Sequence, residues 1–121
     1  MVHADVDRSK NLLRIIYRGR VEAEETKRYL ADITAMVAEL KPGFRLLTDL
    51  SGLESMEVAC VTDIKRIMDA CNKQGVSLVV RVIPDPHKDI GLNILSLFHY
   101  SRKVRIVTCK TLAEAMKVLS A

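Results

Sequence analysis

Aromatic side chains are scarce in this sequence of 121 residues, which has three tyrosines, two phenylalanines and no tryptophan. Proteins that bind single-stranded nucleic acid stack the bases on aromatic rings, and so few rings offer little surface for that. Lysine and arginine outnumber aspartate and glutamate by 19 to 15, but they form no basic run of the kind that marks a nucleic-acid patch. We therefore expect no nucleic-acid partner.

Long hydrophobic runs are absent as well. No stretch approaches the length of about 18 apolar residues that a membrane-spanning helix needs. The first residues, Met1 to Asp5, lack the apolar segment of a signal peptide. These features predict a cytoplasmic protein with no membrane span.

Cysteine is rare, and its three positions, Cys60, Cys71 and Cys109, do not have the spacing of a metal site. Cys60 and Cys71 fall on one predicted helix, where eleven positions separate their Cα atoms by about 16 Å. A disulfide needs Cα atoms within about 7 Å, so these two thiols cannot pair. We predict three reduced, buried thiols, with no metal and no cofactor.

The hydrophobic pattern alternates between the period of a strand and that of a helix. The predicted elements are, in chain order, strands at 2–7 and 12–20, a helix from 23 to 40, a strand at 44–50, a helix that includes 61–71, a strand at 76–83, a helix from 86 to about 100, a strand at 104–108 and a helix after 111. A polar turn at 8–11 makes the first two strands an antiparallel hairpin. Helix-length crossovers between the later strands require parallel pairing. We therefore predict an α/β fold of order ββαβαβαβα in one domain, residues 1–121, with a mixed, mostly parallel sheet.

The strand at 76–83 is an almost continuous apolar run that only Ser77 and Arg81 interrupt. Such a run is typical of a strand that is covered on both faces, so we place it at the centre of the sheet. Gly75, just before it, has the position of a helix cap with positive φ.

The last helix has a recognisable start. Thr111 and Glu114 have the spacing of a capping box, in which each side chain bonds an amide at the helix N-terminus. Leu112, Met116 and Leu119 then share one helical face, which we predict to point inward.

The segment at 48–57, Thr-Asp-Leu-Ser-Gly-Leu-Glu-Ser-Met-Glu, follows the strand at 44–50 and precedes a helix. Together with the element order, this segment resembles the STAS superfamily, the sulphate-transporter and anti-sigma-factor-antagonist domain, including its SpoIIAA-like group. Family members read as a strand, Asp-Leu-Ser, an apolar residue, Met-Asp and then Ser-Ser-Gly-Leu at a helix start. The resemblance implies a small domain that binds partner proteins, and some SpoIIAA-like relatives look suited to apolar ligands.

One position departs from the family pattern in a way that affects its chemistry. Residues 49–51, Leu53 and Met56 keep the pattern, and Glu57 replaces the aspartate conservatively. Val58 stands where signalling members carry the serine that a partner kinase phosphorylates. Valine has no hydroxyl group, so the resemblance implies partner binding without the phosphoserine switch.

Three hydroxyl residues near this helix start, Ser51, Ser55 and Thr62, offer alternative phosphate positions. The unpaired amides and the dipole of a helix N-terminus favour a negative charge there. The simpler interpretation is local structure, because Ser51 and Glu54 have the spacing of a capping box.

The predicted helix from 86 to about 100 is unusually apolar around its circumference. Ile90, Ile94, Leu97 and Phe98 make an ordinary core-facing stripe. Leu92 and Leu95 widen the apolar arc to about 220°, against about 100° for a surface helix. Either loops bury the extra surface, or it faces a protein partner, a second copy of the chain or an apolar ligand.

Polar residues follow two predicted strands at the same edge of the sheet. Asp49 ends one strand, and Asp85, His87 and Asp89 follow another. Ligands of open α/β sheets gather at the carboxyl ends of the strands, and a histidine between aspartates can act as an acid–base or metal site. The same residues are also good turn and cap formers. We assign no catalytic or metal residue and predict that the chain is not an enzyme.

The sequence thus favours a non-catalytic regulatory or scaffold module that binds a protein partner without the phosphoserine switch. The alternative is a carrier or sensor of an apolar small molecule. The candidate binding residues form two groups: Asp49, Ser51, Ser55, Glu57, Val58 and Thr62 in the motif segment, and Asp85, His87, Leu92 and Leu95 in and before the apolar helix.

Overall fold

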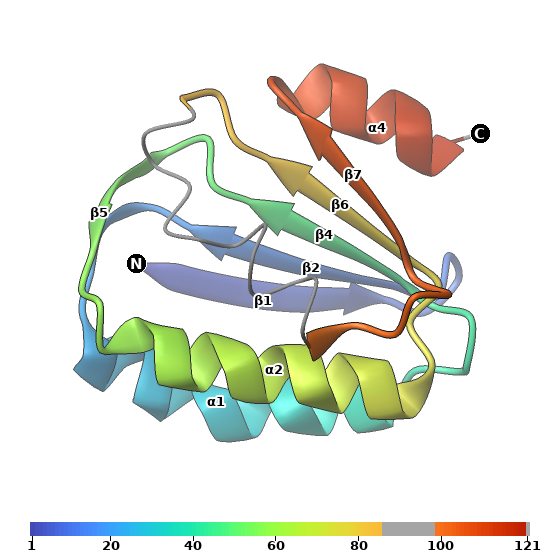
Figure 1. Cartoon of the computed structure of the whole chain (residues 1–121), viewed down its shortest axis with the longest axis horizontal. Helices are drawn as coiled ribbons and strands as arrows, with labels where there is room; N and C mark the ends of the chain where they lie inside the picture. Colours follow the sequence, from blue (N-terminus) through green and yellow to red (C-terminus); the bar gives the residue numbers. More distant parts are fainter. Residues whose placement is uncertain (86–98, 121) are drawn as a thin grey trace.

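The computed structural model describes residues 1–85 and 99–120 of the chain. These residues contain a five-stranded sheet of order β1-β2-β4-β6-β7 with helices on both faces (Figure 1). The sheet and its helices are β1 (Val2–Asp7), β2 (Leu12–Tyr17), α1 (Ala23–Ala38), β4 (Arg45–Asp49), α2 (Cys60–Gln74), β6 (Leu78–Val82), β7 (Arg105–Cys109) and α4 (Leu112–Ser120). β1 pairs with β2 antiparallel, and all other neighbours in this sheet pair in parallel. The predicted mixed sheet with an N-terminal hairpin is confirmed, while residues 86–98 of the helix predicted from 86 to about 100 lie outside the described residues.

A second, two-stranded sheet was not predicted. It consists of β3 (Gly19–Val21) and β5 (Leu53–Met56), which pair in parallel. The prediction of one strand over 12–20 is wrong, because Gly19 has φ of +63° and redirects the chain between β2 and β3. This small sheet connects the end of the hairpin to the motif segment.

The centre of the main sheet is β4, and the prediction that the strand at 76–83 lies there is wrong. β6 lies between β4 and β7, one place from the edge. Its side chains are nevertheless buried on both sides, since Val79 joins the core under α1 and α2 while Val80 and Val82 join the core under α4. Burial on both faces therefore needs helices on both faces and not a central position.

The two faces of the sheet carry separate cores. The larger lies between the sheet and the helices α1 and α2 and includes Leu13, Ile15, Ile33, Leu46, Ile64 and Val79. The smaller lies under α4 and includes Leu47, Val80, Val82, Ala115 and Leu119. At the C-terminus of α2, Gly75 has φ of +89°, which confirms the predicted left-handed cap.

Helix α4 covers only part of its face of the sheet. It contacts β6 and β7 through Ala115 and Leu119, which are buried, whereas Leu112 and Met116 are 43% and 39% exposed. The prediction that Leu112 and Met116 point inward is therefore wrong. The predicted cap is confirmed in part: the Thr111 hydroxyl accepts the Glu114 amide at 3.1 Å, but the Glu114 carboxylate accepts the Lys110 amide rather than that of Thr111.

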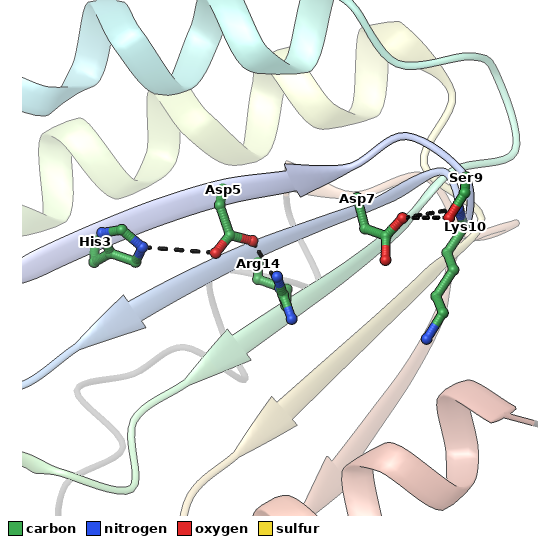
Figure 2. A network of polar contacts seen from close by, with 6 residues as sticks. All are labelled: His3, Asp5, Asp7, Ser9, Lys10 and Arg14. Atoms are coloured by element: carbon green, nitrogen blue, oxygen red, sulfur yellow. Dashed lines mark hydrogen bonds and ion pairs between the residues drawn. The ribbon is translucent and has the colours of Figure 1, made fainter.

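The hairpin carries a polar network on the sheet face that α1 and α2 do not cover (Figure 2). Asp5 accepts a bond from Arg14 Nε at 2.7 Å, and His3 Nε2 lies 3.6 Å from its other oxygen. At the turn, the Ser9 hydroxyl and the Lys10 amide donate to Asp7 and lower the pKa of that carboxyl. An exposed ion pair such as that of Arg14 with Asp5 contributes about 0.2–1 kcal/mol, so the network supports the hairpin register and adds little stability.

The expectation about cysteine agrees with the described part of the chain. Cys60, Cys71 and Cys109 are free and buried, as predicted. In residues 1–85 and 99–120, no helix has the length and apolar character needed to cross a membrane.

Candidate functional site

The motif segment begins with a tight turn at the end of β4. Asp49 is buried, and its Oδ1 accepts the Ser51 amide at 2.9 Å. The Leu50 amide donates to the Val82 carbonyl at 3.0 Å and ties the turn to β6. Glu54 belongs to β5, so the interpretation of Ser51 and Glu54 as a helix capping box is wrong. Of the predicted binding residues, Asp49 thus has a structural role.

Strand β5 of the small sheet connects this turn to the start of α2. The Gly19 amide donates to the Gly52 carbonyl at 2.9 Å, and the Glu57 amide donates to the Val21 carbonyl at 3.0 Å. Leu53 is 1% exposed and belongs to the larger core. The segment is therefore anchored at its beginning, middle and end.

Glu57 joins the motif segment to α1. Its Oε1 accepts the amide of Ala23, the first residue of that helix, at 2.9 Å. A carboxylate in this place satisfies an otherwise unpaired donor and interacts favourably with the positive end of the helix dipole. Sequence reasoning placed Glu57 in a binding site but did not find this role.

Val58 lies at the exposed end of the segment. It is 86% exposed, more than any other large apolar side chain in the described part of the chain. Its carbonyl accepts the Val61 amide, and Ala59 caps α2 without a side-chain hydrogen bond. Ser51, Ser55 and Thr62 are also exposed. We call the exposed residues Ser51, Ser55, Val58, Ala59 and Thr62 the loop surface.

A buried polar pair lies beneath the loop surface. Thr26 of α1 and Asp63 of α2 are 3% and 2% exposed, and the Thr26 hydroxyl donates to Asp63 Oδ2 at 2.8 Å. Sequence reasoning missed this contact, which ties the N-terminal turn of α2 to α1. A buried carboxylate oxygen that loses its donor is costly, so the pair holds the two helix starts in place.

The substitution Thr26→Val should lower the free energy of unfolding by about 1–3 kcal/mol, because it leaves Asp63 Oδ2 without this donor. The control is Thr34→Val on the same helix, whose hydroxyl bonds the carbonyls of Leu30 and Ala31 within α1. Urea unfolding of the two variants measures the difference. Equal losses in both variants would contradict the role of the pair.

A second candidate site lies on the larger core, where sequence reasoning found none. Arg81 of β6 is 4% exposed, and its Nη2 donates to the Thr108 hydroxyl at 2.8 Å. It borders a cavity of about 30 Å³ between the sheet and α2, together with Tyr17 and Tyr100. Burial raises the pKa of both tyrosines, so their hydroxyls stay protonated. The signal in the sequence was the arginine that interrupts the apolar run at 76–83.

Residues 99–101 are held against α2. His99 Nδ1 lies 2.9 Å from Asp69 Oδ1, and the Ser101 amide donates to Asn72 at 2.8 Å. These two contacts flank Tyr100, which is buried in the larger core. The His99 ring therefore contacts the carboxylate of Asp69 on α2.

The described part of the chain does not show the other predicted site residues together in one site. Asp85 follows β6 and is half-buried, at the edge of the sheet where Asp49 ends β4. His87, Asp89, Leu92 and Leu95 lie outside the described residues. In residues 1–85 and 99–120, no three histidine, cysteine or acidic side chains are arranged to hold a metal ion.

Solved structures with this arrangement exist, although no family model and no curated protein matches the sequence. An uncharacterised DUF3478-family protein from Shewanella loihica PV-4, described as having a SpoIIAA-like fold, superposes with a TM-score of 0.73 at 12% identity over 98% of this chain and 93% of its own. The phosphorylated form of the Bacillus cell fate determinant SpoIIAA superposes with a TM-score of 0.68 at 14% identity over 98% and 99%. This chain has a SpoIIAA-like fold. A putative anti-sigma factor antagonist from Thermotoga maritima is also similar, with a TM-score of 0.66 at 17% identity over 100% and 96% of the two chains.

The SpoIIAA-like fold confirms the architecture that the resemblance to the STAS superfamily implied. At these identities the likeness concerns the fold alone, so it carries no residue role from those proteins to this chain. The functional argument therefore depends on this chain's own surface and cavity.

Proposed function

We propose that the chain is a non-catalytic regulatory or scaffold module of SpoIIAA-like fold, which binds a protein partner without a phosphoserine switch. Structures with this fold include anti-sigma factor antagonists, which supports a regulatory role. We also propose that residues 1–121 act as one domain in the cytoplasm, and that a second copy of the chain is one possible partner.

The observation that carries the proposal is the exposure of Val58. An apolar side chain that is 86% exposed on an anchored turn gains free energy when a partner covers it. The turn is held by the β3–β5 pairing and by the bond from Ala23 to Glu57, so little order must be gained on binding. Because Val58 cannot accept a phosphate, binding at the loop surface does not depend on phosphorylation at position 58.

The substitution Val58→Glu should weaken partner capture at least about tenfold, since it places a charge in the contact. The matched control is Leu112→Glu, which changes an exposed leucine on α4, on the other face of the sheet. Both variants and the wild type serve as bait in a lysate of the source cells, and quantitative mass spectrometry measures each captured protein. A partner that Val58→Glu retains and Leu112→Glu loses would contradict the loop surface as the binding site.

The absence of a phosphoserine switch has its own test. The wild-type chain is incubated with a kinase fraction from the source cells, and its intact mass is measured before and after. We expect an unchanged mass and unchanged capture of the partner. Phosphate on Ser51, Ser55 or Thr62 that alters the capture would overturn this part of the proposal.

The cavity beside Arg81 favours a second candidate function, a carrier or sensor of an apolar small molecule. Apart from Arg81 and Thr48, the described lining consists of apolar and tyrosine side chains, as small-molecule sites usually do. Native mass spectrometry of protein purified from its source tests this function. A copurifying lipid-like mass supports the carrier, and a clean apo mass counts against it.

A further inference from the structure

A groove lies on the sheet face opposite α1 and α2, between the hairpin and α4. One row of paired strand residues, His3, Ile16 and Asp49, crosses its floor. Leu112 and Met116 of α4 form an apolar wall, and their side chains are 43% and 39% exposed. The groove has a volume of about 240 Å³, which is below the roughly 300–1,000 Å³ of sites for drug-sized ligands. Its size therefore suits one smaller molecule.

Three of the charged or titratable side chains in the groove satisfy one another. Asp5 accepts a bond from Arg14 Nε at 2.7 Å, and its other oxygen lies 3.6 Å from His3 Nε2 (Figure 2). Among the described residues that border the groove, the remaining charged side chains are those of Arg18 and Asp49. One is a cation and the other an anion, so the groove has one group of each sign left for a ligand.

Asp49 has an oxygen that the described part of the chain leaves without a donor. The residue is 4% exposed, and its Oδ1 accepts the Ser51 amide at 2.9 Å, whereas its Oδ2 accepts no hydrogen bond from the described residues. A carboxylate oxygen in so buried a place needs a donor, and the groove is the side from which a donor can reach it. An ammonium group supplies such a donor together with a compensating charge.

Arg18 lies at the same end of the groove as Asp49. It follows the end of β2, shortly after Ile16, which is the strand partner of Asp49. Its stem lies against the turn after β4, since a Cβ atom on Gly52 would be 3.1 Å from Arg18 Cγ. Within residues 1–85 and 99–120 its guanidinium makes no ion pair or hydrogen bond, so its planar fork is available to a carboxylate.

We propose that this groove binds a free α-amino acid with an apolar side chain. Asp49 Oδ2 accepts the ammonium group, the Arg18 guanidinium binds the carboxylate, and the apolar side chain packs against the wall formed by α4. An α-amino acid carries both charged groups on one carbon atom, which matches two opposite charges at one end of a groove. Burial of its apolar side chain adds to the affinity. The proposal depends on neither candidate function, because no residue of the loop surface borders this groove and the cavity beside Arg81 lies on the other face of the sheet.

The experiment compares L-leucine with isocaproate and isoamylamine, which keep its apolar chain but lack the ammonium and the carboxylate group, respectively. Each is titrated into the isotopically labelled full chain, and amide chemical shifts give the dissociation constants. Leucine should bind at least about tenfold more tightly than isocaproate, because only the ammonium group satisfies the buried carboxylate. It should bind several-fold more tightly than isoamylamine, since Arg18 is exposed and its ion pair is weaker. The shifts should be largest at Ile16, Asp49 and Met116.

Two variants and one control assign these preferences. Asp49→Asn keeps an oxygen for the Ser51 amide but removes the charge, so it should reduce the preference for leucine over isocaproate to within about twofold. Arg18→Gln should abolish the preference over isoamylamine, and it tests the site even if Asp49→Asn does not fold. The control is Arg20→Gln, which changes an exposed arginine of β3 outside the groove and should leave both preferences intact.

Three results would overturn the proposal. They are equal affinity of the wild type for leucine and either analogue, an unchanged preference in a groove variant that folds, and no binding of leucine. Each of them would leave the loop surface and the cavity beside Arg81 as candidate sites, because those are tested by partner capture and by native mass spectrometry.

Discussion

Replacing Leu53 by alanine should lower the free energy of unfolding by about 2–5 kcal/mol, the usual cost of truncating a fully buried leucine. Leu53 is 1% exposed and is the one residue of β5 whose side chain is fully within the larger core. The cost arises from the lost burial and from the space that the missing atoms leave. Urea denaturation with a fixed m-value measures it.

The neighbouring residue provides the control for Leu53. Glu54 lies on the same strand and is exposed, so Glu54→Ala should change the stability by no more than about 0.5 kcal/mol. Because Leu53 also anchors the turn that presents Val58, Leu53→Ala should weaken partner capture in proportion to the fraction of molecules with a displaced loop surface. A loss below about 1 kcal/mol would mean that the motif segment is held by its backbone bonds alone.

The large sheet was predictable because its strands follow simple rules. Alternating or continuous apolar runs identified β1, β2, β4, β6 and β7, and helix-length separations required parallel pairing. β3 and β5 were not predictable in the same way. They are three and four residues long, and in β5 only Leu53 is buried, so no periodic pattern marks them. Their pairing depends on where Gly19 turns the chain, which is a tertiary effect.

The candidate sites also contain some residues that local sequence predicts and others that depend on the tertiary fold. The motif residues follow from local sequence, and among them Ser51, Ser55, Val58 and Thr62 are exposed. The contacts from Ala23 to Glu57 and from Thr26 to Asp63 join residues more than thirty positions apart, and no local pattern contains them. Arg81 was visible as an interruption in an apolar run. The cavity that it borders depends on residues from five other parts of the chain.

The misplaced face of α4 has a physical origin as well. Leu112, Met116 and Leu119 share a helical face, and the pattern alone assigns that face to the core. The sheet beneath is wider than the helix, so α4 buries Ala115 and Leu119 over β6 and β7 and leaves Leu112 and Met116 beside strands that α4 itself does not cover. Amphipathicity thus gives the presence of a buried face but not its exact direction.

The cysteine thiols should be almost unreactive in the folded chain, with the largest effect at Cys71. Burial raises the pKa of Cys71 to about 12 from an ordinary value of 9.0. Three pKa units correspond to about a thousandfold smaller thiolate population at pH 8, and the thiolate is the form that reacts. Burial also raises the pKa of Cys60 and Cys109, so these two thiols should also react more slowly in the folded chain than in the unfolded chain.

The measurement uses the wild-type chain with isotope-coded iodoacetamide, and peptide mass spectrometry gives the alkylation rate at each cysteine. In urea the three rates should agree within a small factor, because the unfolded chain removes their different surroundings. In the folded chain Cys71 should react at least about a thousand times more slowly than in urea at the same pH. Because its pKa is higher in the folded state, Cys71 favours folding fully below pH 9 and loses that contribution as the pH rises toward 12. A folded-state rate within about tenfold of the unfolded rate would show that α2 opens readily from the sheet. That result would contradict the packing of Cys71 in the larger core and, with it, the enclosed wall of the cavity beside Arg81.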